Sequence, residues 1–428
     1  MGAGPAQTGP AAPYAGTVAL TDGATVYLDH AATTPLRPEA RDAMAAHLGL
    51  VGNASSLHGP GRAARRVVED ARESIAADLG ARPSDVIFTS GGTESDNLAI
   101  KGLFWSRFAV GHARRIVCSR IEHHAVLDAV AWLAETGQAE VTWIEADAVG
   151  RIMPETLEAA IGDPADVTLV TCMWANNEVG TVSPIADLAA VAAGARIPFH
   201  TDAVQAAGQV PVDFTASGVD ALSVTAHKIG GPLGIGALLV KPGVAITPLS
   251  HGGGQERNVR SGTFDPPAAA GFAAALRAAT ADLEAESARI AELRHHLVRG
   301  VLASVPDAAL NGDPDLRSSP GAGRLPGNAH FSFPGCDGDS LLLLLDAEGI
   351  ACSTGSACTA GVARPSHVLL GLGADPAQAR SSLRFSLGHD TTQADVDALL
   401  ACIGPVVDRA RSAGARPAVL PARGAGRA

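Results

Sequence analysis

Short apolar runs alternate with longer segments of helical period through the first two thirds of the chain. Runs of this length, separated by helix-length segments, are typical of a mostly parallel sheet with connecting helices. The pattern therefore predicts an α/β fold. The β-rich runs are VIFTS (86–90), IVCS (116–119), VTWI (141–144), VTLVTCMW (167–174), PFHTDA (198–203), ALSVTA (221–226) and GALLV (236–240).

Helices are predicted where apolar residues recur three or four positions apart. One stripe runs from Ala64 to Leu79 and is followed by Gly80, a residue that ends helices well. After residue 280 the pattern changes to a long helix (281–303), a Pro/Gly-rich connection (311–327), short strands and a last helix behind Thr392, which is a candidate N-cap. This part predicts a second, smaller α+β domain.

Composition and charge exclude several classes of protein. The chain has 428 residues, 46% of them apolar and 4% aromatic, and a net charge of -12, which argues against direct nucleic-acid binding. Its six cysteines are sparse and form no CxxC pair, as expected in a reducing, cytoplasmic setting. We expect no membrane partner and no secretion, because no apolar run approaches a membrane span and the start lacks a charged region followed by an apolar core.

Phosphate-binding motifs narrow the chemistry. The chain has three lysines, Lys101, Lys228 and Lys241, and none follows a glycine, which excludes a P-loop. The run VIFTS leads into GGTESDN, where Gly91 and Gly92 allow a tight turn and Thr93 opens a helix. Free amides at such a helix start can bind a phosphate, although a plain capped turn has the same sequence.

Two of the predicted strand ends carry residues that suit pyridoxal phosphate (PLP). Lys228 follows one apolar strand and Asp202 ends another, although Lys241 also follows a strand. PLP chemistry needs a lysine for a Schiff base, an acid beside the pyridine nitrogen and a phosphate cradle. A metal site at His200 and Asp202 is the weaker interpretation, because H-x-D is common, and we expect no metal.

In combination, the motifs resemble the cysteine desulfurases of group I, PLP enzymes of aminotransferase class V and fold type I. The resemblance extends from YLDHAATTP (27–35) to RFSLGHDTT (384–392). It is carried by GNASSLH (52–58), FTSGGTESDN (88–97), EHHAV (122–126), NNEVG (176–180), HTDAVQ (200–205), HK (227–228), GGGQERNVRSGT (252–263) and STGSAC (353–358).

The resemblance implies a role for each matching residue. Lys228 is expected to form the Schiff base, Asp202 to pair with the ring nitrogen, and His123 to stack on the ring and relay protons. Arg384 is expected to bind the substrate carboxylate through its planar fork. Asn177 and Gln205 are expected to contact the ring hydroxyl region, and Asn177 is also expected to lie near the substrate. The phosphate is expected to be held by Gly92, Thr93, Thr225 and His227. Thr263 of a second subunit is expected to reach the same phosphate, which implies a homodimer.

Cys358 is the expected nucleophile. It lies in ACSTGSACTAGVARPS, whose small residues predict a mobile loop, whereas Cys118 and Cys172 lie in apolar runs and are expected to be core residues. The resemblance implies that Cys358 takes the sulfur of L-cysteine as a persulfide, releases L-alanine and passes the sulfur to an acceptor, either an iron–sulfur scaffold or a tRNA-thiolation enzyme. Cys352 is expected to be a bystander.

The resemblance also implies an interleaved arrangement of domains. We expect a large PLP-binding α/β domain over 36–280 and a small α+β domain from 25–35 plus 281–412, which carries the cysteine loop at about 350–365. Residues 1–24 and 413–428 are expected to be flexible tails.

Two departures and several alternatives remain. Thr225 stands where a Ser is commonest in the family, which preserves a hydroxyl. The family pattern HKIYGPKG is HKIGGPLG here, so a Tyr and a Lys are replaced by Gly230 and Leu233. A selenocysteine lyase, an aminotransferase of the same fold, and an inactive docking homologue for sulfur acceptors are the alternatives. Lys228 and Cys358 both argue against the inactive homologue, and Cys358 argues against an aminotransferase.

Overall fold

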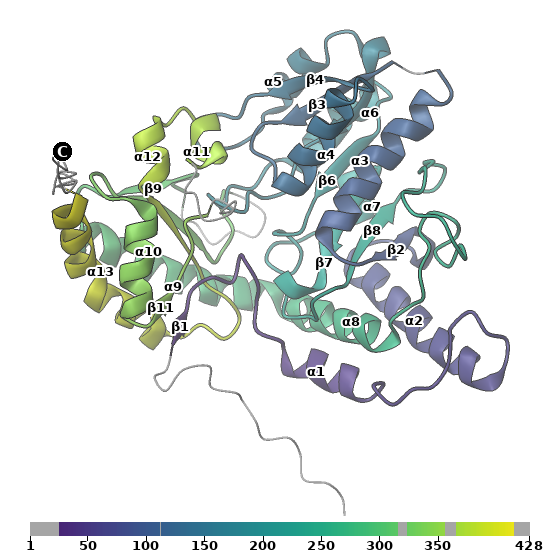
Figure 1. Ribbon diagram of the computed structural model, residues 1–428, viewed down its shortest axis with the longest axis horizontal. Helices are drawn as coiled ribbons and strands as arrows, with labels where there is room; N and C mark the ends of the chain where they lie inside the picture. Colours follow the sequence, from purple (N-terminus) through teal and green to yellow (C-terminus); the bar gives the residue numbers. More distant parts are fainter. Residues whose placement is uncertain (1–24, 112, 316–322, 356–364, 415–428) are drawn as a thin grey trace, which may run out of the picture.

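A seven-stranded sheet with the order β2-β8-β7-β6-β5-β3-β4 forms the centre of the protein, seen in a computed structural model (Figure 1). The structure describes residues 25–111, 113–315, 323–355 and 365–414. β8 is antiparallel to both neighbours, and the other pairs are parallel, as the alternation of strands and helices predicted. The strands are β2 (Val86–Thr89), β3 (Arg115–Ser119), β4 (Glu140–Ile144), β5 (Val167–Thr171), β6 (Phe199–Asp202), β7 (Ala221–Thr225) and β8 (Gly236–Val240).

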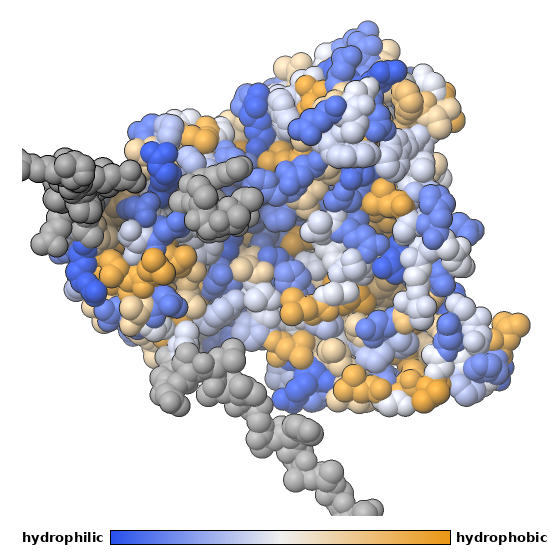
Figure 2. All heavy atoms as spheres, in the orientation of Figure 1, coloured by the Kyte–Doolittle hydropathy of each residue, from blue (hydrophilic) through white to orange (hydrophobic). Residues whose placement is uncertain are grey.

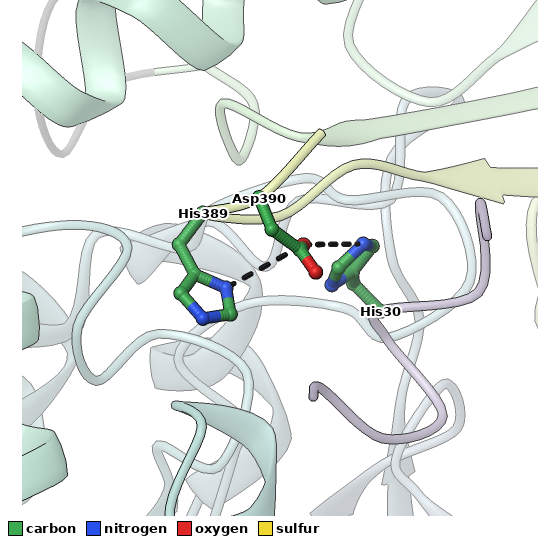
Figure 3. Close-up of side chains that lie close together, drawn as sticks. All are labelled: His30, His389 and Asp390. Atoms are coloured by element: carbon green, nitrogen blue, oxygen red, sulfur yellow. Dashed lines mark ion pairs between the residues drawn. The ribbon is translucent and has the colours of Figure 1, made fainter. Parts of the chain in front are cut away.

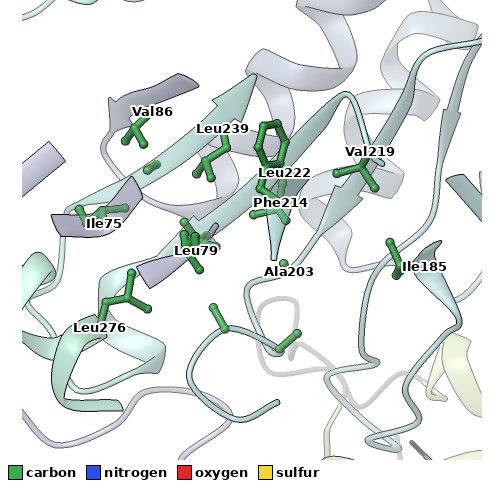
Figure 4. Close-up of a cluster of buried hydrophobic side chains, with 14 of the residues drawn as sticks. Ile75, Leu79, Val86, Ile185, Ala203, Phe214, Val219, Leu222, Leu239 and Leu276 are labelled. Atoms are coloured by element: carbon green, nitrogen blue, oxygen red, sulfur yellow. The ribbon is translucent and has the colours of Figure 1, made fainter. Parts of the chain in front are cut away.

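Both faces of this sheet are buried, because successive side chains of a strand point to opposite faces. Val86 and Phe88 join one apolar core, and Ile87 between them joins another. Figure 4 shows part of the first core, where Leu222 and Leu239 from the sheet lie near Phe214. The sheet is therefore the middle of three layers.

Helices α3 and α4 contribute to one face of the sheet, and α2, α5, α6, α7 and α8 contribute to the core on the other. In this part of the chain the helices are α1 (Pro38–Ala45), α2 (Gly59–Asp78), α3 (Gly92–Phe108), α4 (His124–Glu135), α5 (Pro154–Ile161), α6 (Ile185–Gly194), α7 (Phe214–Ser217) and α8 (Pro266–Ala281). None of the described helices is both long and apolar enough to cross a membrane.

The C-terminal third has its own core around a three-stranded antiparallel sheet, β12-β10-β9. β1, near the start of the chain, pairs in parallel with β11, so the first described residues lie beside the last third of the chain. The domain boundaries remain a prediction. The elements are β1 (Val26–Tyr27), α9 (Leu283–Ser304), β9 (Ala309–Asn311), β10 (Asn328–Ser332), α10 (Gly338–Ala347), β11 (Ile350–Ala351), α11 (His367–Gly371), α12 (Pro376–Arg380), β12 (Ser382–Ser386) and α13 (Gln393–Gly414).

Two local predictions about helix ends are confirmed. Gly80 follows the end of α2 with a φ of 62°, a backbone conformation that glycine adopts without strain. The Thr392 hydroxyl accepts from the Asp395 amide at the start of α13, and Asp395 in turn accepts from the Thr392 amide. The predicted strand 167–174 ends earlier, at Thr171, and the chain then turns toward the site.

Candidate active site

A cavity of about 240 Å³ lies where β6 and β7 end and α3 begins. These three chain segments meet because β2, β6 and β7 run in the same direction, so their carboxyl ends lie at one edge of the sheet. A larger cavity of about 480 Å³, lined by Arg107, Arg196 and Lys241 among others, contains none of the predicted site residues. The smaller cavity is lined by Gly92, Thr93, Asp96, His123, Met173, Asn177, Asp202, Val204, Gln205, Thr225, His227 and Lys228.

Lys228 lies in a short 3-10 turn, Ala226–Lys228, directly after β7. Its Nζ donates to the carbonyl oxygens of Ala31 and Ala32, at 2.6 and 2.7 Å. Burial, together with the positive charge of Arg384, lowers the pKa of Lys228 from 10.5 to about 8. A fraction of the amine is therefore neutral near pH 7 and can act as a nucleophile.

Asp202 forms the acidic end of the cavity. Its carboxylate accepts from the Val204 amide at 2.8 Å, and burial raises its pKa to about 6, although that amide and Lys228 oppose the rise. Asp96, nearby on α3, is also buried, and burial and the charge of Asp202 raise its pKa well above the usual value. Asp96 is therefore the protonated member of the pair, which leaves Asp202 as the carboxylate.

A buried histidine on the sheet, His200, lies close to Asp96. His200 Nδ1 lies 2.9 Å from the Thr171 hydroxyl, and its Nε2 lies 3.0 Å from the Ser223 hydroxyl and 3.6 Å from Asp96 Oδ1. Burial lowers the pKa of His200 to about 3, so the ring is neutral. His200 thus holds neighbouring side chains in place and brings no charge to the cavity.

The start of α3, where the sequence predicts an anion cradle, lies at the cavity. Gly91 has a φ of 151°, which favours glycine, and a Cβ on Gly92 would come within 2.9 Å of Val204 Cγ2. Gly92 and Thr93, in the first turn of the helix, line the cavity, and the amides of a first helical turn have no partner within the helix. The Thr225 hydroxyl, however, donates to the Ile235 carbonyl at 3.2 Å, so it has to rotate before it can donate to an anion.

His123 both caps a helix and lines the cavity. Its Nδ1 accepts from the Ala125 amide at 3.1 Å, so its Nε2 carries the ring proton. Burial and the charge of Lys228 lower the pKa of His123 to about 4, which keeps the ring neutral. The sequence is compatible with either a helix-capping or a cavity-lining histidine. The structure shows that His123 does both.

Arg384 lies in a second cavity that adjoins the first and shares His123, Asn177, Gln205 and Lys228 with it. Its guanidinium donates to Asp29 Oδ1 and to the Asn177 carbonyl, each at 2.8 Å. Among the described residues, Arg384 Nε has no hydrogen-bond partner although it is buried. A two-pronged contact between this guanidinium and a substrate carboxylate therefore requires competition with Asp29.

Among the predicted site residues that the structure describes, Thr263 lines neither of these two cavities. Thr263 lines another pocket, of about 110 Å³, with Arg260 and Phe264. Cys358 lies outside the described residues. The two cysteines expected in the core, Cys118 and Cys172, are fully buried, and burial raises the pKa of Cys352 to about 12, so its thiol is poorly suited to nucleophilic attack.

Sequence reasoning missed several residues that line or support the site. Asp96 and Val204 each lie within a few residues of a predicted site residue, so periodicity along α3 and the strand-end loop could have indicated them. Asp29 and His367 are brought in from distant segments. Only the tertiary structure shows these two.

The residues present fit pyridoxal phosphate. Asn177 and Asp96 line the cavity, and Oδ1 of each is buried with no hydrogen-bond partner among the described residues, as expected where polar groups of a ligand complete the site. Asp202 supplies a buried anion for a protonated ring nitrogen, the start of α3 supplies amides for a phosphate, and Lys228 supplies the amine.

Comparisons with known proteins agree with this arrangement. The chain is 58% identical over 388 residues to an IscS-like cysteine desulfurase of Mycobacterium tuberculosis, which covers 90% of this chain and 97% of that protein. It is 43% identical to the cysteine desulfurase IscS of Dictyoglomus turgidum, over 90% of this chain and 95% of that one. A solved NifS-like protein matches with a TM-score of 0.81 and 34% identity, over 90% of this chain and all (100%) of the other.

The family match covers nearly the whole described part of the chain. The aminotransferase class-V family matches residues 26–399, from β1 into α13. This range contains both cavities and every predicted site residue. The chain therefore belongs to the aminotransferase class-V family.

Proposed function

We propose that the protein is a PLP-dependent cysteine desulfurase that converts L-cysteine to L-alanine and carries the sulfur as a persulfide on Cys358. The observation that carries this proposal is the placement of Lys228, Asp202 and the start of α3 around one cavity, with Arg384 in the adjoining one. Its relatives named cysteine desulfurase span almost the same length of chain.

PLP, when bound, supplies an electron sink that weakens bonds at the α-carbon of an amino acid. Lys228 is the amine placed to hold the cofactor and, once released, to take the α-proton of the substrate, because burial lowers its pKa to about 8. Asp202 stabilises the positive ring nitrogen from the sheet edge. His123 presents its Nε2–H as a neutral donor beside Lys228.

Arg384 is proposed to bind the substrate carboxylate. The guanidinium is almost fully buried, and Asp29 and the Asn177 carbonyl fix its plane. A charged group held in this way before substrate arrives loses little entropy on binding. The exchange of Asp29 for the substrate carboxylate keeps the positive charge paired throughout.

Cys358 is proposed to take the sulfur. Its thiolate bonds to the sulfur of the substrate, the carbon–sulfur bond breaks, and the electron pair and a proton remain on what becomes the methyl group of alanine. L-cysteine and one thiol thus give L-alanine and one persulfide, with no external oxidant or reductant. Cys352 cannot substitute, because its thiol is buried and its pKa is raised to about 12.

A homodimer is proposed from the position of one expected phosphate contact and from exposed apolar side chains. Thr263, expected at the phosphate, lies in a different pocket of the same chain. Large apolar side chains are exposed in the segment between α1 and α2, among them Val51, which is 82% exposed, and Leu57, which is 88% exposed. Figure 2 shows apolar atoms on the surface where α1 and α2 lie. A second subunit would cover such residues and bring its Thr263 to the site.

The destination of the sulfur is also proposed from the resemblance. We expect transfer to an acceptor protein, either an iron–sulfur cluster scaffold or a tRNA-thiolation enzyme, in the cytoplasm. The cysteines that the structure describes are all free, which is compatible with a reducing compartment.

The experiment that tests the activity is an incubation of the PLP-loaded protein with L-cysteine, in which alanine and protein persulfide are measured together. Equal amounts in the first turnover are expected. Alanine without persulfide would indicate a different reaction, and neither product would support the inactive docking homologue.

A further inference from the structure

A cluster of His30, His389 and Asp390 lies outside both cavities of the candidate active site (Figure 3). His30 comes from the segment after β1, and the other two come from the turn between β12 and α13. One nitrogen of each ring and a carboxylate oxygen lie within 4.8 Å of one another. His30 is buried, and Asp390 is 51% exposed, so the cluster opens to solvent on one side.

Each ring nitrogen of His30 lies near a hydroxyl oxygen, Nδ1 near Thr34 and Nε2 near Thr391. The Thr34 hydroxyl donates to the His30 carbonyl at 3.2 Å, so its oxygen can only accept from the ring. That oxygen lies 3.4 Å from His30 Nδ1. When the proton of the neutral ring is on Nδ1 and is donated to Thr34, Nε2 has a lone pair.

This lone pair points toward another acceptor. His30 Nε2 lies 3.4 Å from Asp390 Oδ1, and an imidazole lone pair and a carboxylate cannot hydrogen-bond without a cation between them. The Thr391 hydroxyl, 3.3 Å from Nε2, can donate to it but leaves Asp390 unpaired with His30.

His389 places a third possible metal-ligand atom beside the Asp390 carboxylate. Its Nδ1 lies 3.6 Å from Asp390 Oδ1 and is buried, with no hydrogen-bond partner among the described residues. The rings of His30 and His389 meet edge to face, with centroids 6.5 Å apart.

We propose that His30 Nε2, His389 Nδ1 and the Asp390 carboxylate form a binding site for a divalent transition-metal ion of the Zn²⁺ type. Two neutral imidazoles and one carboxylate are preferred zinc ligands, with bonds of about 2.0–2.2 Å, which place tetrahedral ligand atoms about 3.3 Å apart. The two distances to Asp390 Oδ1, 3.4 and 3.6 Å, are close to this value. The exposed side of Asp390 leaves room for a water as the fourth ligand.

The position of the cluster suggests what a bound ion would do. Ala31, the residue after His30, accepts from Lys228 through its carbonyl. Its amide donates to Ser386, the last residue of β12. An ion between His30 and the turn after β12 would tie these two segments together next to the lysine. The site is therefore a structural one that fixes the two segments next to Lys228. It takes no part in the reaction itself.

Cobalt spectroscopy on the PLP-loaded protein tests the site. Co²⁺ is added to chelator-treated wild type, to Asp390→Asn and to His389→Ala, neither of which alters a residue of the active site. The matched control is Asp397→Asn, which makes the same change at an exposed His296–Asp397 pair with a 2.8 Å contact. We expect visible ligand-field bands in wild type and control that Zn²⁺ displaces, and an affinity at least about tenfold weaker in Asp390→Asn and His389→Ala.

Three outcomes would overturn the proposal. Equal Co²⁺ binding in all four proteins would place the metal elsewhere, and intense thiolate charge-transfer bands alone would assign it to cysteines. The absence of binding would show that the cluster is an ordinary hydrogen-bonded one. As a second readout, saturating Zn²⁺ should raise the unfolding midpoint of wild type and Asp397→Asn but not of Asp390→Asn, because an ion that binds only the folded state stabilises it.

Discussion

Arg384 donates to Asp29 across 2.8 Å and so joins β12 to the segment after β1, at the wall of the cavity next to Lys228. The guanidinium that is proposed to bind substrate is therefore already paired in the folded chain. This pairing makes two substitutions informative, because they alter the two members of the pair with opposite expected effects.

Arg384→Lys is expected to raise KM for L-cysteine about 30-fold. A lysine cannot contact Asp29 and the Asn177 carbonyl in one plane, and the loss of one charge-assisted hydrogen bond costs about 2 kcal/mol. Asp29→Asn is expected to lower KM, because it removes a negative charge that competes with the substrate carboxylate. Steady-state kinetics with the visible absorbance of the cofactor as a loading control measure both, and an unchanged KM in Arg384→Lys would exclude the assigned role.

Lys228→Ala is expected to abolish the visible absorbance of lysine-bound PLP, because no other described amine lines the cavity. Lys241→Ala is the matched control, since Lys241 also follows a strand but is exposed and lies 3.7 Å from Asp220. Absorption spectra after addition of PLP compare the two. Loss of absorbance in Lys241→Ala, with Lys228→Ala unaffected, would reverse the assignment.

The rate at which the apo-protein takes up PLP is expected to rise with pH and to level off above about pH 8. The attacking species is the neutral amine, and with a pKa of about 8 roughly a tenth of Lys228 is neutral at pH 7. Absorbance followed over time at a series of pH values gives the profile. A rate that keeps rising to about pH 10 would show that the lysine titrates like an exposed one.

Cys358→Ala is expected to keep the cofactor absorbance and to lose persulfide formation and sulfide release. Cys352→Ala serves as the comparison, and we expect it to remain active because the Cys352 thiol is buried and protonated. Mass spectrometry of the protein after one turnover detects the added sulfur. Normal sulfide release by Cys358→Ala would contradict the mechanism.

Glu122→Gln is expected to change the free energy of unfolding more favourably at about pH 8.5 than at about pH 5. Burial raises the pKa of Glu122 to about 8, so between pH 4.5 and 8 the folded state binds more protons than the unfolded state, and stability falls as pH rises. Glutamine removes this loss and can still accept from the Met173 amide. The unfolding midpoints of wild type and variant at both pH values measure this effect. Glu155→Gln, at an exposed position, is the control. Equal shifts of the midpoint in the two variants would refute the prediction.

The strand and helix pattern could be predicted from the sequence because burial repeats with a period of two in strands and near 3.6 in helices. The cavity followed from the same pattern. Lys228, Asp202 and Thr93 lie at or just after the ends of strands that run in one direction, and those ends meet at one edge of a sheet. The sequence of motifs along the chain was therefore sufficient to indicate the family and the cofactor.

The tertiary structure alone showed that Asp29 pairs with Arg384, that Asp96 lies beside Asp202, and that His30 meets His389 and Asp390. The first and last of these contacts join the two ends of the chain, and no local period relates residues so far apart. The charge states of Lys228, Asp202 and Asp96 were also beyond the sequence. They depend on how deeply each group is buried and which charges surround it, and only the folded chain sets these quantities.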